Sequence, residues 1–359
     1  MANYTTIDDP SAFFQTMLHA EDDTAFTFDG NSDLQPDWIW IKNRDENNYH
    51  PHMIDSVRGI SKLLRPSAEI AEFTSADSIT AIGSNGFTTG ADDNGYVSSG
   101  TDKQVSWCWK AGTSFSNDAS STSVGSIDSA GSVNTDAGFS IITFAGSGAD
   151  GSVAHGLGVA PSMIISKSRT ASDQGWVVTH KSLGFTQSLL LNGTAAKYNV
   201  ANDFGGQGIS AFGSATFSMT IGNGTFLNMS NQNYVAYCFA EKKGYSKFGS
   251  YEGNANADGT FVHLGFKPAF LITKPIDAAD NWNMFDNKRL AFNSATSPFA
   301  ITPNNANLET TDTHQLDFLS NGFKINNGGN TVNRASTFIY WAFAESPFVT
   351  STGIPTTAR

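Results

Sequence analysis

Charge is scarce in this sequence, and positive charge is the scarcer sign. Only 15% of the 359 residues are charged, and 33 Asp and Glu against 21 Lys and Arg give a net charge of −12. Phosphate recognition needs clustered Lys and Arg, so neither a nucleic acid nor an anionic membrane is expected as a partner. A helical bundle is also disfavoured, because bundles are rich in Ala, Leu, Glu and Lys.

Cysteines and long apolar runs are also rare or missing. Cys108 and Cys238 are the two cysteines, and they stand at matching positions of two sequence repeats. We interpret both as buried free thiols rather than as a disulfide. No apolar run approaches the ~18 residues of a membrane-spanning helix, and the N-terminus lacks a signal-peptide pattern. We therefore expect a soluble protein that is made in a reducing cytoplasm.

Gly, Ser, Thr and Asn are abundant, and the sequence contains 27 Phe. Aromatic and β-branched residues favour strands, whereas Gly, Asn and Ser favour turns. The composition therefore predicts an all-β protein with many turns and uncharged polar faces.

A short aromatic run with β-branched residues occurs three times. Each copy is predicted to be a strand that is buried on both faces or nearly so. The copies span residues 105–110, 233–241 and 338–345. Their recurrence indicates a repeated structural unit.

A strand that starts from proline recurs in the same way, and Lys stands six residues after each proline. Proline suits the first position of a strand, where its missing N–H breaks no ladder hydrogen bond. The three copies span residues 36–42, 161–167 and 268–274. Turn and hairpin signals keep the same order between these anchors, which supports true repeats.

The predicted fold is a tandem array of three β-sandwich (jelly-roll-like) domains. Each repeat has about 100 residues and about seven or eight strands, as sandwiches do. We expect separate beads rather than the rungs of a solenoid, with the second and third beads abutting directly. The predicted segments are 1–112 (first repeat with a lead-in), 113–137 (Ser/Gly/Asn-rich linker or extended arm), 138–244 (second repeat), 245–348 (third repeat) and 349–359 (tail).

An Asp-x-x-Arg pattern occurs at the same place in the first and third repeats. It could form a binding site for a sugar or carboxylate, or an ion pair that braces a strand end. We favour the ion pair, because the pattern recurs within a structural frame. The residues are Asp55 and Arg58, Asp286 and Arg289, and, at the same place in the second repeat, His180 and Leu183.

Metal-binding patterns are present but incomplete. Residues 254–259 imitate the first half of a calcium loop, but Gly265 stands where the EF-hand pattern needs Glu. We interpret this segment as a hairpin turn. His50 and His52 lack a third ligand at zinc-site spacing. Residues 92–95 form an acidic turn for which calcium has no further support.

No catalytic, cofactor-binding or metal-binding residue is assigned, and an enzyme is not expected. A nucleophile elbow is missing, and both cysteines lie inside aromatic strands, where a thiolate would be costly. Carboxylate pairs for glycoside hydrolysis cannot be identified from sequence alone. Most tryptophans are expected in the core, with a sugar-stacking or subunit-facing role as the alternative: Trp38, Trp40, Trp107, Trp109, Trp282 and Trp341.

The assembled motifs resemble a family of uncharacterised virion proteins from marine tailed bacteriophages, which infect cyanobacteria and abundant marine heterotrophs. The resemblance covers essentially the whole chain, and it implies a virion structural role of tail or fibre type. The family supplies no catalytic residues. The motifs are residues 3–10 followed by 14–16, then 36–43, 55–59, 107–112 and 234–248.

From this resemblance we expect a virion surface protein that acts in host attachment as a tail-fibre or tail-tip component. A capsid decoration or head-fibre protein is the main alternative, and a polysaccharide depolymerase is less favoured. The expected partners are other virion proteins, further copies of the chain (for example in a trimer) and a host surface glycan. No cofactor is expected.

Overall fold

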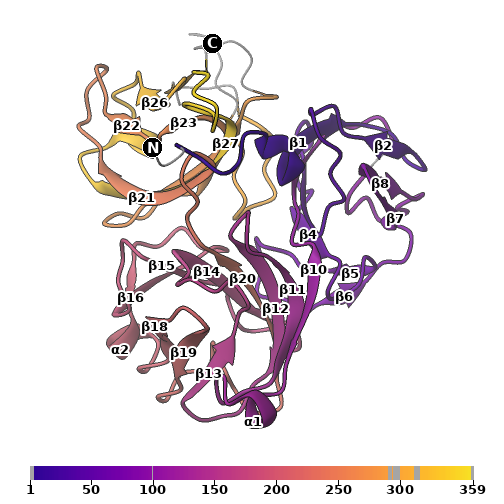
Figure 1. Ribbon diagram of the computed structural model, residues 1–359, viewed down its shortest axis with the longest axis vertical. Helices are drawn as coiled ribbons and strands as arrows, with labels where there is room; N and C mark the ends of the chain where they lie inside the picture. Colours follow the sequence, from indigo (N-terminus) through magenta and orange to yellow (C-terminus); the bar gives the residue numbers. More distant parts are fainter. Residues whose placement is uncertain (1–3, 99, 290–292, 294–299, 311–315, 357–359) are drawn as a thin grey trace.

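Antiparallel strands make up nearly all of the regular structure, which confirms the predicted all-β class. The computed structural model describes residues 4–98, 100–289, 293, 300–310 and 316–356. The chain forms three lobes around a common centre (Figure 1). No helix in the described part of the chain is long and apolar enough to cross a membrane.

The same four-strand order occurs once in each sequence repeat. The aromatic strand pairs with the first strand of its repeat on one side and with the proline-led strand on the other, and a fourth strand follows. The three sets are β1 (Phe14–His19), β9 (Gln104–Trp109), β3 (Trp38–Asn43) and β4 (His52–Asp55); β12 (Phe139–Ala145), β20 (Asn233–Phe239), β14 (Met163–Ser168) and β15 (Val177–His180); and β21 (Ser246–Glu252), β27 (Thr337–Pro347), β23 (Phe266–Pro275) and β24 (Asn283–Asp286).

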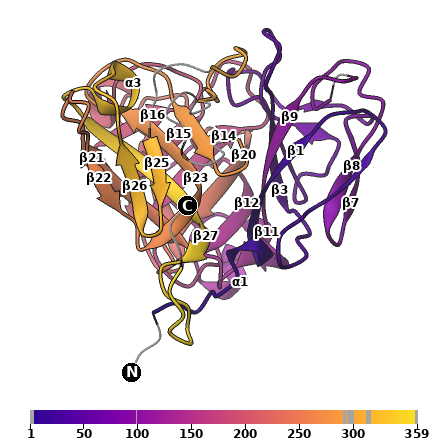
Figure 2. The ribbon, with the colours of Figure 1, turned by 90° about the horizontal axis from the view of Figure 1, so that it is seen from above.

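A smaller three-stranded sheet accompanies each of these sets. In Figure 2, β7 and β8 lie at one outer side of the molecule, and β22 and β26 lie at the other. The smaller sheets are β2 (Ala25–Thr27), β8 (Gly86–Thr89) and β7 (Ile79–Gly83); β13 (Gly151–Ala154), β19 (Thr216–Thr220) and β18 (Gly208–Phe212); and β22 (Phe261–His263), β26 (Gly322–Ile325) and β25 (Leu316–Leu319).

Side-chain alternation along the strands divides the core in two. In β3, Ile39 and Ile41 join a cluster with Phe87 of the small sheet, and the second repeat has its own cluster with Phe217. In the third repeat, Phe323 of the small sheet belongs to the same cluster as Trp38 and Trp40. Trp38 and Trp40 point to the other face of β3 and join a cluster with members from all three repeats. Neighbouring repeats therefore cover the second face of β3. The aromatic strands β9, β20 and β27 are buried along nearly their whole length, so their predicted burial on both faces is confirmed.

Aromatic contacts at the centre link every pair of repeats. Trp38 stacks on Tyr237 with ring centroids 4.6 Å apart, Trp109 meets Phe343 at 5.6 Å, and Phe239 meets Phe343 at 6.0 Å. The repeats therefore are not separate beads, because one face of each four-stranded set is buried against the others. The predicted domain boundaries remain predictions.

The segment 113–137 is not a linker. It contains β10 (Thr113–Asn117), α1 (Ala119–Thr122) and β11 (Ser129–Asn134), and β11 pairs with β12 along its whole length. With β16 (Gln187–Leu190) and β17 (Tyr198–Asn199) at the opposite edge, the second repeat has an eight-stranded sheet. The composition misled the prediction, because small polar residues suit a solvated edge strand as well as a linker.

The remaining short elements connect these sheets, and the N-terminal lead-in crosses to the third repeat. Tyr4 Oη donates to the Gly265 carbonyl at 2.8 Å, and Asp8 accepts from the Ser351 backbone N–H at 2.6 Å. The lead-in therefore joins the chain ends. The short elements are η1 (Pro10–Ala12), β5 (Lys62–Leu63), β6 (Phe73–Thr74), α2 (Val200–Asp203) and α3 (Asn330–Asn333).

Candidate functional site

The Asp-x-x-Arg residues form completely buried ion pairs. Arg58 Nε lies 2.5 Å from Asp55 Oδ2, and none of the four side chains in the two pairs is exposed. Each pair follows a strand end, β4 or β24, and each Arg backbone N–H also donates to the Asp carboxylate. A sugar or carboxylate ligand therefore has no access, and the ion-pair interpretation holds, although the pairs are buried rather than exposed.

Each ion pair also contacts a neighbouring repeat. Tyr237 Oη of the second repeat donates to Asp55 at 2.7 Å, and Trp107 Nε1 of the first repeat donates to Asp286 at 3.0 Å. Burial alone would lower the pKa of Arg58, but the carboxylates of Asp55 and Glu72 outweigh it and raise that pKa. The guanidinium therefore stays charged, and its partner Asp55 joins the first repeat to the second through Tyr237.

In the second repeat, both charged residues of the ion pair are replaced together by uncharged ones. His180 Nε2 pairs with the Tyr340 carbonyl at 3.2 Å, and burial lowers the His180 pKa to about 3. Leu183 stands in place of the Arg. A neutral imidazole and an apolar side chain thus replace a buried ion pair, which is a well-tolerated exchange in protein interiors.

At least one further ion pair lies at each junction between repeats. In each pair, one residue comes just after a proline-led strand, and the other lies in the segment beyond the fourth strand of the neighbouring repeat. The partners are Arg169 and Glu72, Arg44 and Glu309, and Lys197 and Asp277, with the charges reversed in the last pair. These contacts brace the junctions.

The imitation calcium loop is a turn whose oxygens already accept hydrogen bonds. Asn333 Nδ2 donates to Asn254 Oδ1 at 2.9 Å and to the Asn256 carbonyl at 2.7 Å. Lys324 Nζ lies 2.5 Å from Asp258 Oδ1. These amide and ammonium donors occupy the atoms that a calcium ion would need.

The histidine and acidic-turn candidates are also satisfied within the fold. His52 Nδ1 pairs with the Tyr96 carbonyl at 2.8 Å, and His50 Nδ1 pairs with Ser67 Oγ at 2.8 Å. Asp92 accepts from two backbone N–H groups and from Ser78 Oγ. Over the described ranges, no group of three or more His, Cys, Asp and Glu side chains is placed to hold a metal ion.

The two cysteines are free and buried, as predicted. Burial raises the pKa of both thiols, so neither is an activated nucleophile. All six named tryptophans are buried, and so is Trp176. None of them presents an open face for stacking against a sugar.

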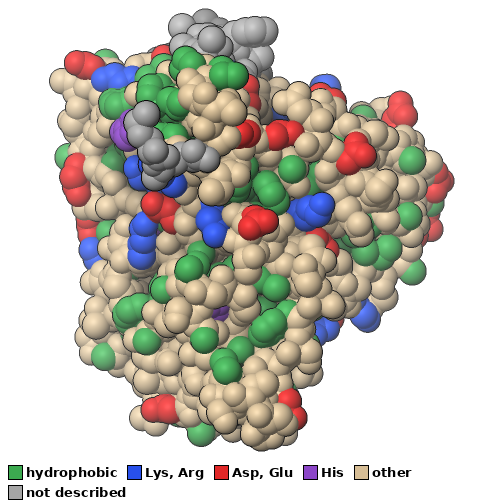
Figure 3. All heavy atoms as spheres, in the orientation of Figure 1, with side chains coloured by type: hydrophobic (Ala, Val, Ile, Leu, Met, Phe, Trp, Pro, Cys, Tyr) green, Lys and Arg blue, Asp and Glu red, His purple; other side chains and the backbone are tan. Residues whose placement is uncertain are grey.

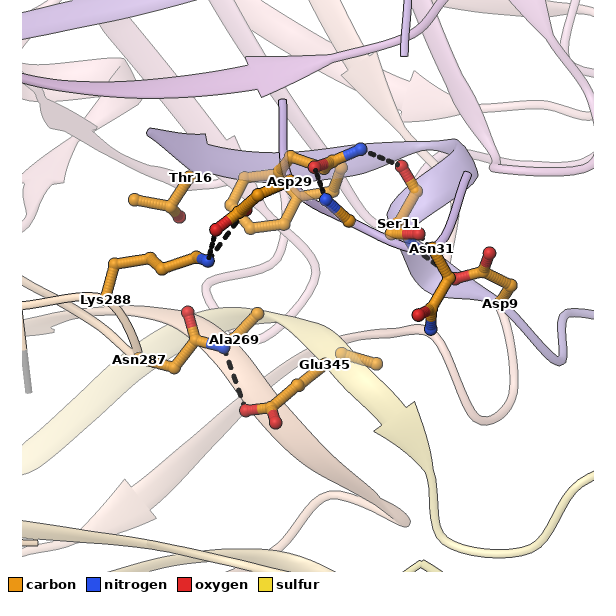
Figure 4. A pocket seen from close by; sticks show the side chains of 13 residues that line it. Asp9, Ser11, Thr16, Asp29, Asn31, Ala269, Asn287, Lys288 and Glu345 are labelled. Atoms are coloured by element: carbon orange, nitrogen blue, oxygen red, sulfur yellow. Dashed lines mark hydrogen bonds and ion pairs between the residues drawn. The ribbon is translucent and has the colours of Figure 1, made fainter. Parts of the chain in front are cut away.

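A groove of about 370 Å³ lies between the first and third repeats. Figure 4 shows its two walls, and Lys288 reaches across from the third repeat to Asp29 of the first. We call this the inter-repeat groove. The residues that line it include Asp9, Phe14, Thr16, Asp29, Asn31, Ala269, Asn287, Lys288, Ala344 and Glu345.

The first-repeat wall is held by Gln15 at the start of β1. Its Oε1 accepts from the Gly30 N–H, and its Nε2 donates to the carbonyls of Ser11 and Ser32, each at 2.9 Å. Asp9 accepts from both serine hydroxyls. The turn after β2 is thus tied to the lead-in, which fixes the position of Asn31.

The third-repeat wall is held by an amide and two ion pairs. Asn287 Nδ2 donates to Glu345 Oε2 at 2.8 Å, and Lys267 Nζ lies 2.9 Å from the other oxygen. Lys288 Nζ lies 2.7 Å from Asp29 Oδ2, and this bridge is largely exposed. The groove therefore offers fixed amides, hydroxyls and carboxylates on an apolar base.

Sequence reasoning identified none of the groove residues as functional. The lead-in and the segment 14–16 were used only as motifs of the family resemblance. Only their contact with the third repeat could have indicated a site. That contact depends on how repeats far apart in sequence pack together.

Charged side chains are scattered over the face seen in Figure 3, between wide uncharged areas.

The fold and the groove define a class of protein: an all-β chain of repeated two-layer units closed around one shared aromatic core. Residues 9–347 match the family described as a domain of unknown function (DUF7483), and the chain belongs to this family. No curated protein matches the chain, and no solved structure matches it.

Proposed function

We propose that the chain is a structural protein on the surface of a tailed-phage virion, where it acts in host attachment as a tail-fibre or tail-tip component. The closed packing of three repeats around one core carries this proposal. It makes a rigid body that holds loops and the inter-repeat groove in fixed positions, as recognition surfaces require.

The phage context rests on the resemblance of the motif set to virion proteins of marine tailed bacteriophages. The buried state of the Asp-x-x-Arg pairs agrees with a structural use of these residues rather than a catalytic one. The net charge of −12 favours protein and neutral glycan partners over nucleic acid.

The attachment role is tested with purified full-length protein and with virions that lack it. The protein is expected to bind susceptible cells, and the deficient virions are expected to adsorb poorly. Normal adsorption of those virions, together with no binding of the protein to cells, would overturn the role.

The place on the particle is tested by electron microscopy of virions that carry a labelled chain. Label on the tail supports the proposal, whereas label on the head supports a capsid decoration or head-fibre protein. Release of oligosaccharides from host envelope glycans by the pure protein would contradict a purely structural role.

A further inference from the structure

The inter-repeat groove contains polar groups that the fold leaves unused. Thr16 is 4% exposed, and its Oγ1 is buried without a hydrogen-bond partner in the described part of the chain. Buried hydroxyls normally have a partner. Thr16 lines the groove and points from β1 toward the gap that Lys288 spans (Figure 4). Its free hydroxyl therefore indicates a site for a ligand atom.

Two amides add further groups to the same groove. Asn31 is exposed, and its side chain makes no hydrogen bond within the described residues. Asn287 Nδ2 donates to Glu345, whereas Asn287 Oδ1 accepts no hydrogen bond from the described residues. A hydroxyl and an amide can both donate and accept, so the unused groups suit a ligand whose own groups do both.

The charges exclude strongly charged ligands. Asp9, Asp29 and Glu345 oppose an anion, whereas Lys288 and the donors that already engage the carboxylates oppose a bare cation. Neutral hydroxyl groups face neither penalty. Phe14, Ala269 and Ala344 line the base of the groove but are buried, so the polar groups around it carry the recognition.

We propose that the inter-repeat groove binds a neutral saccharide. One sugar ring lies in the groove, with hydroxyl groups on Thr16, Asn31 and Asn287. The groove volume is at the lower end of small-molecule sites, which run from about 300 Å³ upward. The inference rests on the proposed attachment role, because it names the class of receptor that this surface recognises.

A second hollow gives the saccharide room to extend. It has a volume of about 260 Å³ and shares Thr16, Asp29 and Lys288 with the groove. The bridge between Lys288 and Asp29 separates the two hollows, and its side chains are 38% and 73% exposed. Exposed bridges are weak, so a chain of two rings can displace this one and lie across both hollows.

The test is saturation-transfer NMR on the full-length protein with the methyl glycosides of glucose, mannose, galactose and N-acetylglucosamine. At least one is expected to bind with a millimolar Kd. The double variant Thr16→Val with Asn31→Ala is expected to lose about tenfold or more in affinity, which corresponds to roughly one hydrogen bond.

The control is the double variant Thr179→Val with Asn223→Ala in the second repeat. Thr179 Oγ1 is also buried without a partner, and Asn223 is exposed. This control should bind like the unchanged protein, and circular dichroism should show that both double variants are folded. Equal affinity of the two double variants would overturn the inference.

Absence of binding by all four glycosides up to about 50 mM would also overturn it. So would binding of calcium chloride alone that Asp29→Asn abolishes, since the groove would then be a cation site. Virions with the Thr16/Asn31 double variant that adsorb normally would contradict the groove as the receptor site, whereas the attachment role itself depends on the virions that lack the protein. Lost adsorption without saccharide binding would contradict only the saccharide assignment.

Discussion

Buried charge is the main feature at the scale of single residues. Arg58 pairs with Asp55 where neither side chain is exposed, and also with Glu72, which shares Arg169 as a second cation. Removing one partner of such a pair leaves an uncompensated charge in the interior, which costs far more than the pair contributes. The second repeat shows that the whole set can be exchanged without charge, since it has His180 and Leu183 at these positions.

We predict that Arg58→Ala destabilises the protein by about 3–5 kcal/mol, because the buried Asp55 carboxylate then has no cation, whereas Glu72 keeps only Arg169. Chemical denaturation monitored by tryptophan fluorescence measures the loss. The double change Asp55→His with Arg58→Leu copies the second repeat and is expected to cost clearly less. A larger loss in the double variant would contradict this account.

Three buried histidines predict acid sensitivity. Burial lowers the pKa of His19, His52 and His180 to about 3, from an unfolded value near 6.5. Below pH 6.5 the unfolded chain binds protons that the folded chain does not, so the free energy of unfolding falls as pH drops from about 6.5 toward 3. Protonation of His52 would also place a cation beside Arg65, whose Nε lies 3.4 Å away.

The measurement is the melting temperature between pH 8 and pH 4. It should fall below about pH 6.5, and the fall should be shallower in His52→Gln, which removes one titrating group. A melting temperature that stays constant over this range, or an equally steep fall in the variant, would argue against buried neutral histidines.

Single strands in this protein serve two cores at once. Phe343 of β27 contacts Trp109 of the first repeat and Phe239 of the second, whereas Cys108 and Cys238 belong to the core of their own repeat. The aromatic pattern predicted burial on both faces but could not show what covers each face. The segment 113–137 failed as a linker for a related reason, since β10 pairs with β11 and β11 pairs with β12, which lies outside the segment.

We predict that Phe343→Ala costs about 3–5 kcal/mol, because it opens a cavity where the three repeats meet. Cys108→Ala is the comparison, and it should cost much less because the third repeat has Ala342 at that position. Denaturation midpoints of both variants decide the matter, and similar losses would count against the shared core.

We also predict that Gly131→Ala disrupts the β10–β11 edge. A Cβ at Gly131 would lie 1.8 Å from the Ile141 carbonyl oxygen, whereas one at Gly193 would meet nothing closer than 3.6 Å. Hydrogen exchange should therefore accelerate in β10 and β11 of Gly131→Ala but not in Gly193→Ala. Unchanged protection in both variants would indicate that this segment is a loose arm.

The whole molecule is a ring of three repeats rather than a string of beads. Contacts run from each repeat to both others, so the closed arrangement leaves no repeat with a free inner face. An isolated repeat would expose residues such as Trp38, Tyr237 and Phe343, which are 0–2% exposed in the full chain. Stability should therefore be shared across the molecule.

We predict that the full chain unfolds in one cooperative transition and that residues 138–244 alone do not fold stably. Calorimetry of the full chain tests the first part, and circular dichroism with a hydrophobic dye tests the second. Three separable transitions, or a stable isolated second repeat, would contradict this prediction and indicate that the repeats are independently folding domains.

The sequence by itself determined the all-β class, the recurring strands and the two-sided burial of the aromatic runs, because these follow from composition and alternation along short segments. It also indicated that Cys108 and Cys238 are buried packing residues. Only the tertiary structure decided what covers the second face of each strand and where the groove lies. Trp38 and Tyr237, or Asn31 and Asn287, are distant in the chain, and no local pattern determines how the repeats that carry them pack together.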